Sequence, residues 1–201
     1  MAKQASPRSR PGGRTARTTE AVYEAAIAEL GDRAYDEVGM DSIAARAGVH
    51  KTTVYRRWGT KDRVLAEALD RAAEQRVTVP DTGDVGRDLR ALALAVQKVL
   101  TSRDGAATAR ALAAAAPRSA EIRGVIQRFW ATRMTHVGPI VERAVTRGQL
   151  PAGTDADALL KHLSAPLYQR LLVTLEPVNR RAAERAAAAT LAAAQAGVFV
   201  G

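Results

Sequence analysis

The chain has 201 residues and is basic, with 30 Lys and Arg residues against 21 Asp and Glu residues and a formal net charge of +9. It contains no cysteine, which excludes disulfide bonds and thiolate metal sites. It has no apolar stretch long enough to cross a bilayer, and its first residues lack the apolar core of a secretory signal. We therefore expect a cytoplasmic protein without a membrane partner, and the positive charge favours a polyanionic partner such as nucleic acid.

The charged residues are grouped in the N-terminal third. Residues 1–17 contain five basic and no acidic residues, residues 18–43 have a net charge of −6, and residues 44–63 have a net charge of +5. Residues 1–13 are polar and rich in Ser, Pro, Gly and Arg, a composition that cannot bury enough apolar surface to fold. We expect a disordered basic tail there, followed by a second basic cluster that favours a binding surface.

Helical periodicity recurs along the chain beyond this tail, interrupted by a turn segment at residues 32–39 and a linker at residues 79–83. It predicts helices over residues 15–30, 40–47, 51–58 and 60–77, then over residues 85–100, an Ala-rich stretch ending at residue 116, 119–147 with a kink at Pro139, 155–175 containing Pro166, and 179–196. No segment alternates with period two, so we expect an all-α fold class. The expected divisions are the tail (1–13), a three-helix helix-turn-helix domain (14–60), a connecting helix (61–79) and a C-terminal helical domain (80–201).

Residues 40–58 have the residue types that a helix-turn-helix needs. Ala44 and Ala47 are small where two helices approach closely, and Gly48 allows the left-handed backbone of a tight turn. Both helices are too short to be stable alone, so they must pack on their neighbours. In this motif, the N-terminal residues of the second helix contact base edges in the major groove.

That second helix begins with side chains suited to DNA. Lysine pairs with guanine acceptors and threonine contacts bases, whereas tyrosine and arginine suit phosphate oxygens, and a helix N-terminus favours a phosphate. The predicted DNA-binding residues are Arg14, Ser42, His50, Lys51, Thr52, Thr53, Tyr55, Arg56 and Lys61. The alternative for each of these residues is a role in the scaffold of the motif. For the apolar residues of the same segment a scaffold role is the interpretation we favour: Ile43, Ala44, Ala47, Val49 and Val54, and in part Tyr55 and Trp58.

About residues 14–70 resemble the TetR family of bacterial transcriptional regulators. The matching residues, in order, are Ile43-Ala44, Ala47-Gly48-Val49, Thr53-Val54-Tyr55-Arg56-Arg57-Trp58, Lys61 and Leu65. His50 stands where the family often has serine, and Trp58 where phenylalanine is commoner. Residues 142–150 and 166–173 look like the C-terminal region of some TetR-like regulators.

The resemblance implies that the C-terminal domain binds an effector and forms a homodimer through its last two helices. The apolar face of Leu159, Leu160, Leu163, Leu167, Leu171 and Leu172 suits either a dimer interface or the core of one subunit. A ligand pocket is expected to be lined by Phe129, Trp130, Arg133, Met134 and Tyr168, although an aromatic stripe at helical spacing is more often core. Such a pocket mixes apolar walls with a few polar groups.

The function implied by the resemblance is repression at a palindromic operator in double-stranded DNA, released by an unknown small-molecule effector. An enzyme is not expected, because the three histidines are scattered and no metal-ligand spacing or phosphate loop is present, and neither a metal nor a cofactor is predicted. The alternative is a nonspecific DNA-binding or membrane-surface protein. The sequence leaves open the effector, the operator, the regulated genes and the choice between repression and activation.

Overall fold

The computed structural model describes residues 12–74, 79–117 and 119–201. In these residues the helices are α1 (Gly12–Asp32), η1 (Tyr35–Glu37, a 3₁₀ turn), α2 (Met40–Arg46), α3 (Lys51–Trp58), α4 (Lys61–Glu74), α5 (Val85–Thr101), α6 (Arg103–Ala115), α7 (Ala120–Val137), α8 (Pro139–Thr146), α9 (Ala156–Leu172) and α10 (Arg180–Gln195). The described chain has no strand, only an isolated bridge between Thr154 and Val200. The expected all-α class is confirmed.

The helix-turn-helix forms where the sequence predicts it. Gly48 adopts the left-handed conformation in the turn between α2 and α3, with φ +65°, and Gly59 does the same after α3, with φ +75°. Glycine adopts a positive φ at little energetic cost, whereas a residue with a side chain would strain the backbone at either position. Ile43 and Val54 are fully buried, and they belong to one hydrophobic cluster with residues of α1 and α4. The two short helices are therefore stabilised by packing on longer neighbours.

A second hydrophobic cluster fills the C-terminal part of the chain. α9 turns its leucine face inward, against α5 and α10. The buried leucines of α9 are Leu159, Leu160, Leu163, Leu167 and Leu171. Alanines on α10, such as Ala183 and Ala187, are also buried, and their small size lets the helices approach closely. The leucine face is thus core of the subunit.

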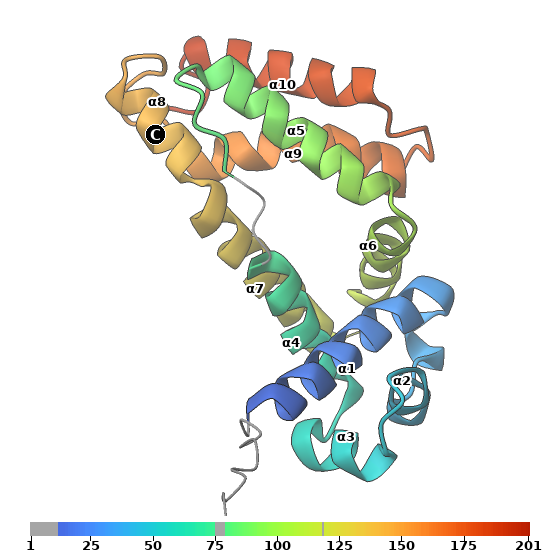
Figure 1. The fold of residues 1–201 in the computed structure, drawn as a ribbon. Helices are drawn as coiled ribbons and strands as arrows, with labels where there is room; N and C mark the ends of the chain where they lie inside the picture. The colour runs from blue at the N-terminus through green and yellow to red at the C-terminus, as the bar shows by residue number, and fades with distance from the viewer. Residues whose placement is uncertain (1–11, 75–78, 118) are drawn as a thin grey trace, which may run out of the picture.

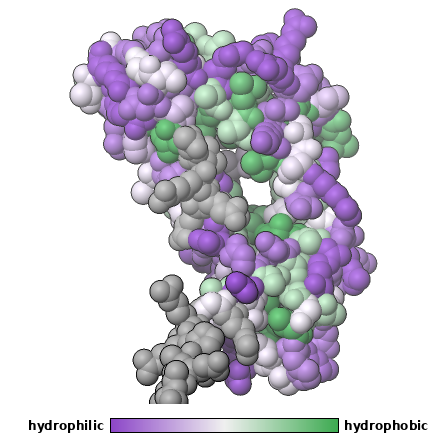
Figure 2. Space-filling view, viewed as in Figure 1, coloured by the Kyte–Doolittle hydropathy of each residue, from purple (hydrophilic) through white to green (hydrophobic). Residues whose placement is uncertain are grey.

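Figure 1 shows how the two clusters are joined. α1 to α4 lie at one end of the molecule, and α5, α9 and α10 lie at the other. α6 and α7 run between the two ends and connect them. α6 packs on α1, and α7 packs on α4. Figure 2 shows an opening between these parts, with hydrophobic residues above and below it. Helices of the C-terminal part therefore pack directly on α1 of the helix-turn-helix domain and on α4, the helix that follows it.

Some helix limits differ from those expected. The expected helix 119–147 is interrupted at Gly138 and forms two helices, α7 and α8. Gly138 keeps helical dihedrals (φ −48°, ψ −38°), so the chain bends there without reversing. α9 ends at Leu172 rather than at residue 175. Leu175 has a left-handed backbone (φ +53°), and the N–H of Glu176 bonds back to the carbonyl of Arg170 (3.0 Å), which closes the end of the helix.

The expected tail and connecting helix fall partly on residues that are not described. Gly12 and Gly13, expected in the tail, begin α1, and residues 1–11 lie outside the described residues. The described part of the connecting helix, α4, ends at Glu74, and residues 75–78 also lie outside. None of the described helices is both long and apolar enough to span a membrane.

Candidate nucleic-acid interface and ligand cavity

α3 presents a basic, hydrogen-bonding face to the solvent. His50 is the N-cap residue, and it is exposed together with Lys51, Thr52 and Arg56. Tyr55, in the middle of the helix, keeps 47% of its surface exposed. The opposite face, with Val54, is buried. These predicted residues therefore lie together on one accessible face, with the geometry that a recognition helix requires.

Two weak contacts orient the start of α3. His50 Nδ1 and Thr52 Oγ1 share a hydrogen bond of 2.9 Å. Lys51 Nζ lies 3.7 Å from a carboxylate oxygen of Asp41, and both side chains are more than 60% exposed. An ion pair so exposed contributes little stability. A phosphate or a base edge can replace it at small cost.

The other predicted DNA-binding residues lie elsewhere. Ser42, on α2, is half-buried, and its hydroxyl donates to the carbonyl of Gly39 (2.9 Å) and accepts from its N–H (3.2 Å), which fixes the start of α2. Thr53 is half-buried. Lys61 donates to the carbonyl of Tyr35 (2.8 Å) and lies 4.1 Å from the centre of its ring, so its first role is to hold α4 on η1. Arg14 lies in the first turn of α1, but its side chain is outside the described residues.

Trp58 is a core residue rather than a surface one. It is 2% exposed, and its indole N–H donates to Glu67 of α4 (2.8 Å), which also accepts a bond from the hydroxyl of Tyr23 on α1 (2.8 Å). Burial of Glu67 opposes its ionisation, but these hydrogen bonds outweigh burial and hold its pKa below the ordinary value of 4.5. Burial, with help from Glu67, raises the pKa of Tyr23 to about 12. One ionised carboxylate thus fastens α1 and α3 to α4.

Arg57 also connects α3 to α1. Its guanidinium donates to the hydroxyl of Thr19 (2.5 Å) and stacks 4.7 Å from the centre of the Trp58 ring. The sequence shows the charge of Arg57 but not this partner, which is 38 residues away. Arg57 therefore holds the N-terminal half of α1 beside α3, a role that sequence reasoning did not find.

A chain of ion pairs joins α2, α1 and α6. Arg46 of α2 contacts Glu29 (2.9 Å) and Asp32 (2.7 Å) of α1, and Asp32 also pairs with Arg103 of α6 (2.7 Å). Glu29 is only 2% exposed, and a buried carboxylate requires such a partner. The hydrogen bond from Arg46 holds the pKa of Asp32 below its ordinary value. These contacts link the helix-turn-helix to the C-terminal part.

A second polar contact joins α4 to α7. Asp62, in the first turn of α4, accepts a hydrogen bond from the hydroxyl of Tyr35, and its hydrogen bond with Glu121 of α7 raises the pKa of Glu121. Further along the same two helices, Asp70 lies 4.0 Å from Arg128. The N-terminal half of α7 is therefore bound to the helix that follows the recognition helix.

The five predicted ligand-binding residues lie around one cavity between α5, α7 and α9. The cavity has a volume of about 70 Å³. Its lining consists of Phe129, Trp130, Arg133, Met134 and Tyr168 together with Leu92, Ala95, Val96, Val99, Val137, Leu160, Leu163 and Ser164. Drug-sized ligands usually need several hundred Å³. A ligand of that size therefore fits only if the cavity widens or if part of the ligand lies outside it.

The aromatic residues of the cavity pack edge to face. The ring centres of Phe129 and Trp130 are 5.9 Å apart, and those of Trp130 and Tyr168 are 5.4 Å apart. The guanidinium of Arg133 lies 5.4 Å from the centre of the Phe129 ring. Burial lowers the pKa of Arg133, and burial raises the pKa of Tyr168, with Arg133 opposing. The cavity therefore combines apolar walls with one partly desolvated cation.

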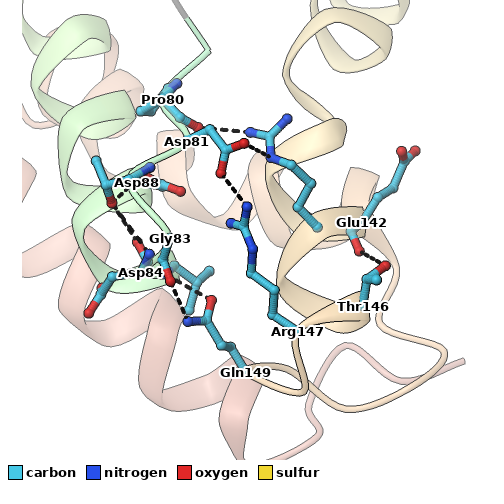
Figure 3. Close-up of polar contacts among 12 residues, drawn as sticks. Pro80, Asp81, Gly83, Asp84, Asp88, Glu142, Thr146, Arg147 and Gln149 are labelled. Atoms are coloured by element: carbon cyan, nitrogen blue, oxygen red, sulfur yellow. Dashed lines mark hydrogen bonds and ion pairs between the residues drawn. The ribbon is translucent and has the colours of Figure 1, made fainter.

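Residues 142–150 have a structural role that Figure 3 makes clear. Arg143 donates to the carbonyl of Pro80 (2.8 Å), and Arg147 contacts Asp81 (2.7 Å). The side-chain amide of Gln149 donates to the carbonyl of Gly83 (2.7 Å). This clamp, formed by α8 and the turn after it, fixes the segment through which the chain enters α5.

The fold and the exposed basic face of α3 define a helix-turn-helix DNA-binding protein. The family model described as "Bacterial regulatory proteins, tetR family" matches residues 22–68, and "Tetracyclin repressor-like, C-terminal domain" matches residues 79–190. The chain belongs to the TetR family and is a DNA-binding transcriptional regulator. This confirms the family that the sequence resembles.

Individual relatives agree with this assignment. The chain is 36% identical to the HTH-type transcriptional regulator AqdR of Rhodococcus erythropolis over 71% of this chain and 69% of the relative. It is 30% identical to the uncharacterized HTH-type transcriptional regulator YdeS of Bacillus subtilis over 87% of each chain. The crystal structure of the TetR family transcription regulator SCO0332 superposes with a TM-score of 0.72 at 28% identity, covering 89% of this chain and 96% of the other.

Proposed function

We propose that the protein is a homodimeric repressor that binds a palindromic operator and leaves it when a small molecule enters the cavity between α5, α7 and α9. The observation that supports DNA recognition most directly is the exposed face of His50, Lys51, Thr52, Tyr55 and Arg56 on α3. Such a regulator acts in the cytoplasm, where it meets DNA. A dimer that presents two copies of α3 matches a site with two half-sites about 34–36 Å apart.

The outer faces of α9 and α10 suit the dimer interface. The leucines of α9 are used inside the subunit. The outward residues include the small, exposed Ala165, Ala188, Ala189 and Ala192, which permit close helix packing. Val173 and Leu175 in the loop after α9 are 72% and 76% exposed, and Val198 after α10 is 66% exposed. Pairing of these faces in two subunits forms a four-helix bundle and covers these apolar side chains.

The release mechanism follows from how α6 and α7 connect the two ends of the molecule. A ligand that separates α5, α7 and α9 binds the widened arrangement more tightly than the closed one, and only such a difference in affinity can shift the equilibrium. α7 transmits the change to α4, and α6 transmits it to α1. The spacing between the two recognition helices then no longer matches the operator, and DNA affinity falls.

The test is selection of bound sequences from a random pool of double-stranded DNA, with the full chain at near-physiological salt. Recovery of an inverted repeat, bound by a dimer, is the expected result. A pool without a shared motif, bound with an affinity that only declines as salt rises, contradicts the proposal and supports a nonspecific DNA-binding protein.

A further inference from the structure

We propose that the ligand of this cavity is an organic anion, with an apolar ring or alkyl body and one carboxylate-sized charged group that Arg133 binds. This inference rests on the proposed function of the cavity as the effector site and adds the chemical class of the effector. It follows from the charge of the lining, the packing of its aromatic rings and the state of its polar groups.

The walls select an apolar body. Their side chains come mainly from aliphatic and aromatic residues: Leu92, Val96, Val99, Phe129, Trp130, Met134, Val137, Leu160 and Leu163. Ser164 adds little polarity, because its hydroxyl is bonded to the carbonyls of Leu160 and Lys161 in its own helix (3.2 Å each). Contact with these walls replaces water on the ligand by apolar surface, which is favourable in proportion to the area covered.

Arg133 sets the charge of the ligand. Among the described residues that line the cavity it is the one charged side chain, so the lining carries a net charge of +1. Its guanidinium stays protonated at physiological pH, yet its surroundings solvate it less well than water, as the lowered pKa shows. A carboxylate that enters the cavity is attracted by this charge and matches the fork of N–H donors on the guanidinium. A cationic ligand meets repulsion instead.

Tyr168 can support the same anion. It lies on α9, facing Trp130, and it interacts electrostatically with Arg133. Because burial raises its pKa, its hydroxyl keeps its proton near neutral pH and is able to donate. Arg133 from α7 and Tyr168 from α9 thus offer donors from two of the three helices around the cavity. A ligand that bonds to both favours one particular widened arrangement, as an effector must.

The experiment compares matched ligands that differ only in their head group. Three apolar bodies (phenylpropyl, naphthylmethyl and decyl) are each tested as a carboxylate, an alcohol and an ammonium ion, by calorimetric titration into the full chain. We expect at least one carboxylate to bind about tenfold or more tightly than its own alcohol, as a charge-assisted hydrogen bond predicts, and the ammonium ions to bind least.

Variants then assign the preference to one side chain. Arg133→Met is expected to weaken carboxylate binding about tenfold or more while alcohol binding stays within about twofold. Arg133→Lys keeps the charge and should retain part of the preference. Lys98→Met removes an exposed positive charge from α5, outside the lining, and should change neither affinity. Retained alcohol binding also shows that the Arg133 variants are folded.

The proposal is overturned if no carboxylate binds, if the alcohols bind as tightly as the carboxylates, or if Arg133→Met weakens both to the same extent. A parallel titration of operator DNA separates this failure from failure of the proposed function. An alcohol that binds best and releases DNA refutes the anionic ligand but supports the regulator. A carboxylate that binds through Arg133 while DNA stays bound supports the ligand class and refutes the release mechanism.

Discussion

At the scale of single residues, Glu67 holds the helix-turn-helix domain together. It accepts bonds from Tyr23 of α1 and Trp58 of α3, so one side chain on α4 fixes the angle at which the recognition helix is presented. The sequence identifies Trp58 as part of a family pattern, but it does not show that the indole needs an acceptor nine residues later. Sequence reasoning therefore found the motif and missed the residue that orients it.

We expect Glu67→Gln to reduce the free energy of unfolding by about 1–2 kcal/mol at pH 7, because charge-assisted hydrogen bonds become neutral ones. The loss is no larger because Glu67 is partly exposed to solvent. The folded-state pKa is lowered, so the stabilisation is present above the ordinary pKa of 4.5 and disappears as pH falls through the lower folded value. Urea unfolding at pH 7 and at more acidic pH measures this. A difference between wild type and variant that persists unchanged in acid contradicts the assignment.

The N-terminal residues of α3 should determine sequence specificity. Thr52→Ala and Lys51→Ala each remove an exposed group placed for base contact, and each is expected to weaken operator binding by about 1–3 kcal/mol. Binding to random DNA should change much less for Thr52→Ala. Arg87→Ala, an exposed residue of α5, is the control. Equal losses on operator and random DNA for Thr52→Ala would show that Thr52 does not contact a base.

At the scale of the helices, α6 connects the C-terminal part of the chain to the helix-turn-helix domain through the ion pair of Arg103 and Asp32. Arg103 is 83% exposed on its side chain, so this pair alone contributes little to stability. Asp32 also holds Arg46 of α2, which makes the pair part of a path from α6 to the recognition motif. Its importance should therefore appear in coupling rather than in stability.

We expect Arg103→Ala to change the free energy of unfolding by less than about 0.5 kcal/mol and to reduce the ligand-dependent loss of operator affinity several-fold. Arg87→Ala, at an exposed position near the start of α5, is the control. The measurement is operator affinity with and without saturating ligand. Full release in the Arg103 variant, equal to that of the control, would assign coupling to α7 alone.

Helix positions were predictable because the apolar periodicity is strong, and helix ends were less so. The break at Gly138 was expected only as a kink at Pro139, because local sequence does not specify the angle at which α8 packs. α9 ends early because the chain reverses at Leu175, which has a positive φ, and periodicity cannot show that a leucine takes this conformation. Phe129, Trp130, Arg133 and Met134 were predictable as a group because they lie close together on α7, but the way α5 and α9 enclose them, with Tyr168 on α9, depends on tertiary packing.

At the scale of the whole molecule, the two sides of the α9 and α10 pair have different roles. The inner side is the core of the subunit and the outer side is the proposed dimer surface. Periodicity reveals the leucine face, but it gives no indication of which partner covers it. The structure assigns these leucines to the core.

Paired substitutions distinguish the two sides. Leu163→Ala removes a fully enclosed side chain, 1% exposed, and is expected to lower the free energy of unfolding by about 2–5 kcal/mol. Ala189→Arg adds a charge to the outer side and should yield folded monomers with weak operator binding. Ala131→Arg, at an exposed position of α7, is the control. Light scattering that finds an intact Ala189→Arg dimer contradicts the proposed interface.

The length of α7 has a mechanical consequence. Its 18 residues span about 27 Å, with the cavity beside one end and α4 beside the other. If the cavity end acts as a pivot, a rotation of about 5° moves the far end by about 2 Å, a displacement typical of helix shifts in allosteric proteins. α7 is in this sense a lever arm, and the position of the cavity along it sets the amplification.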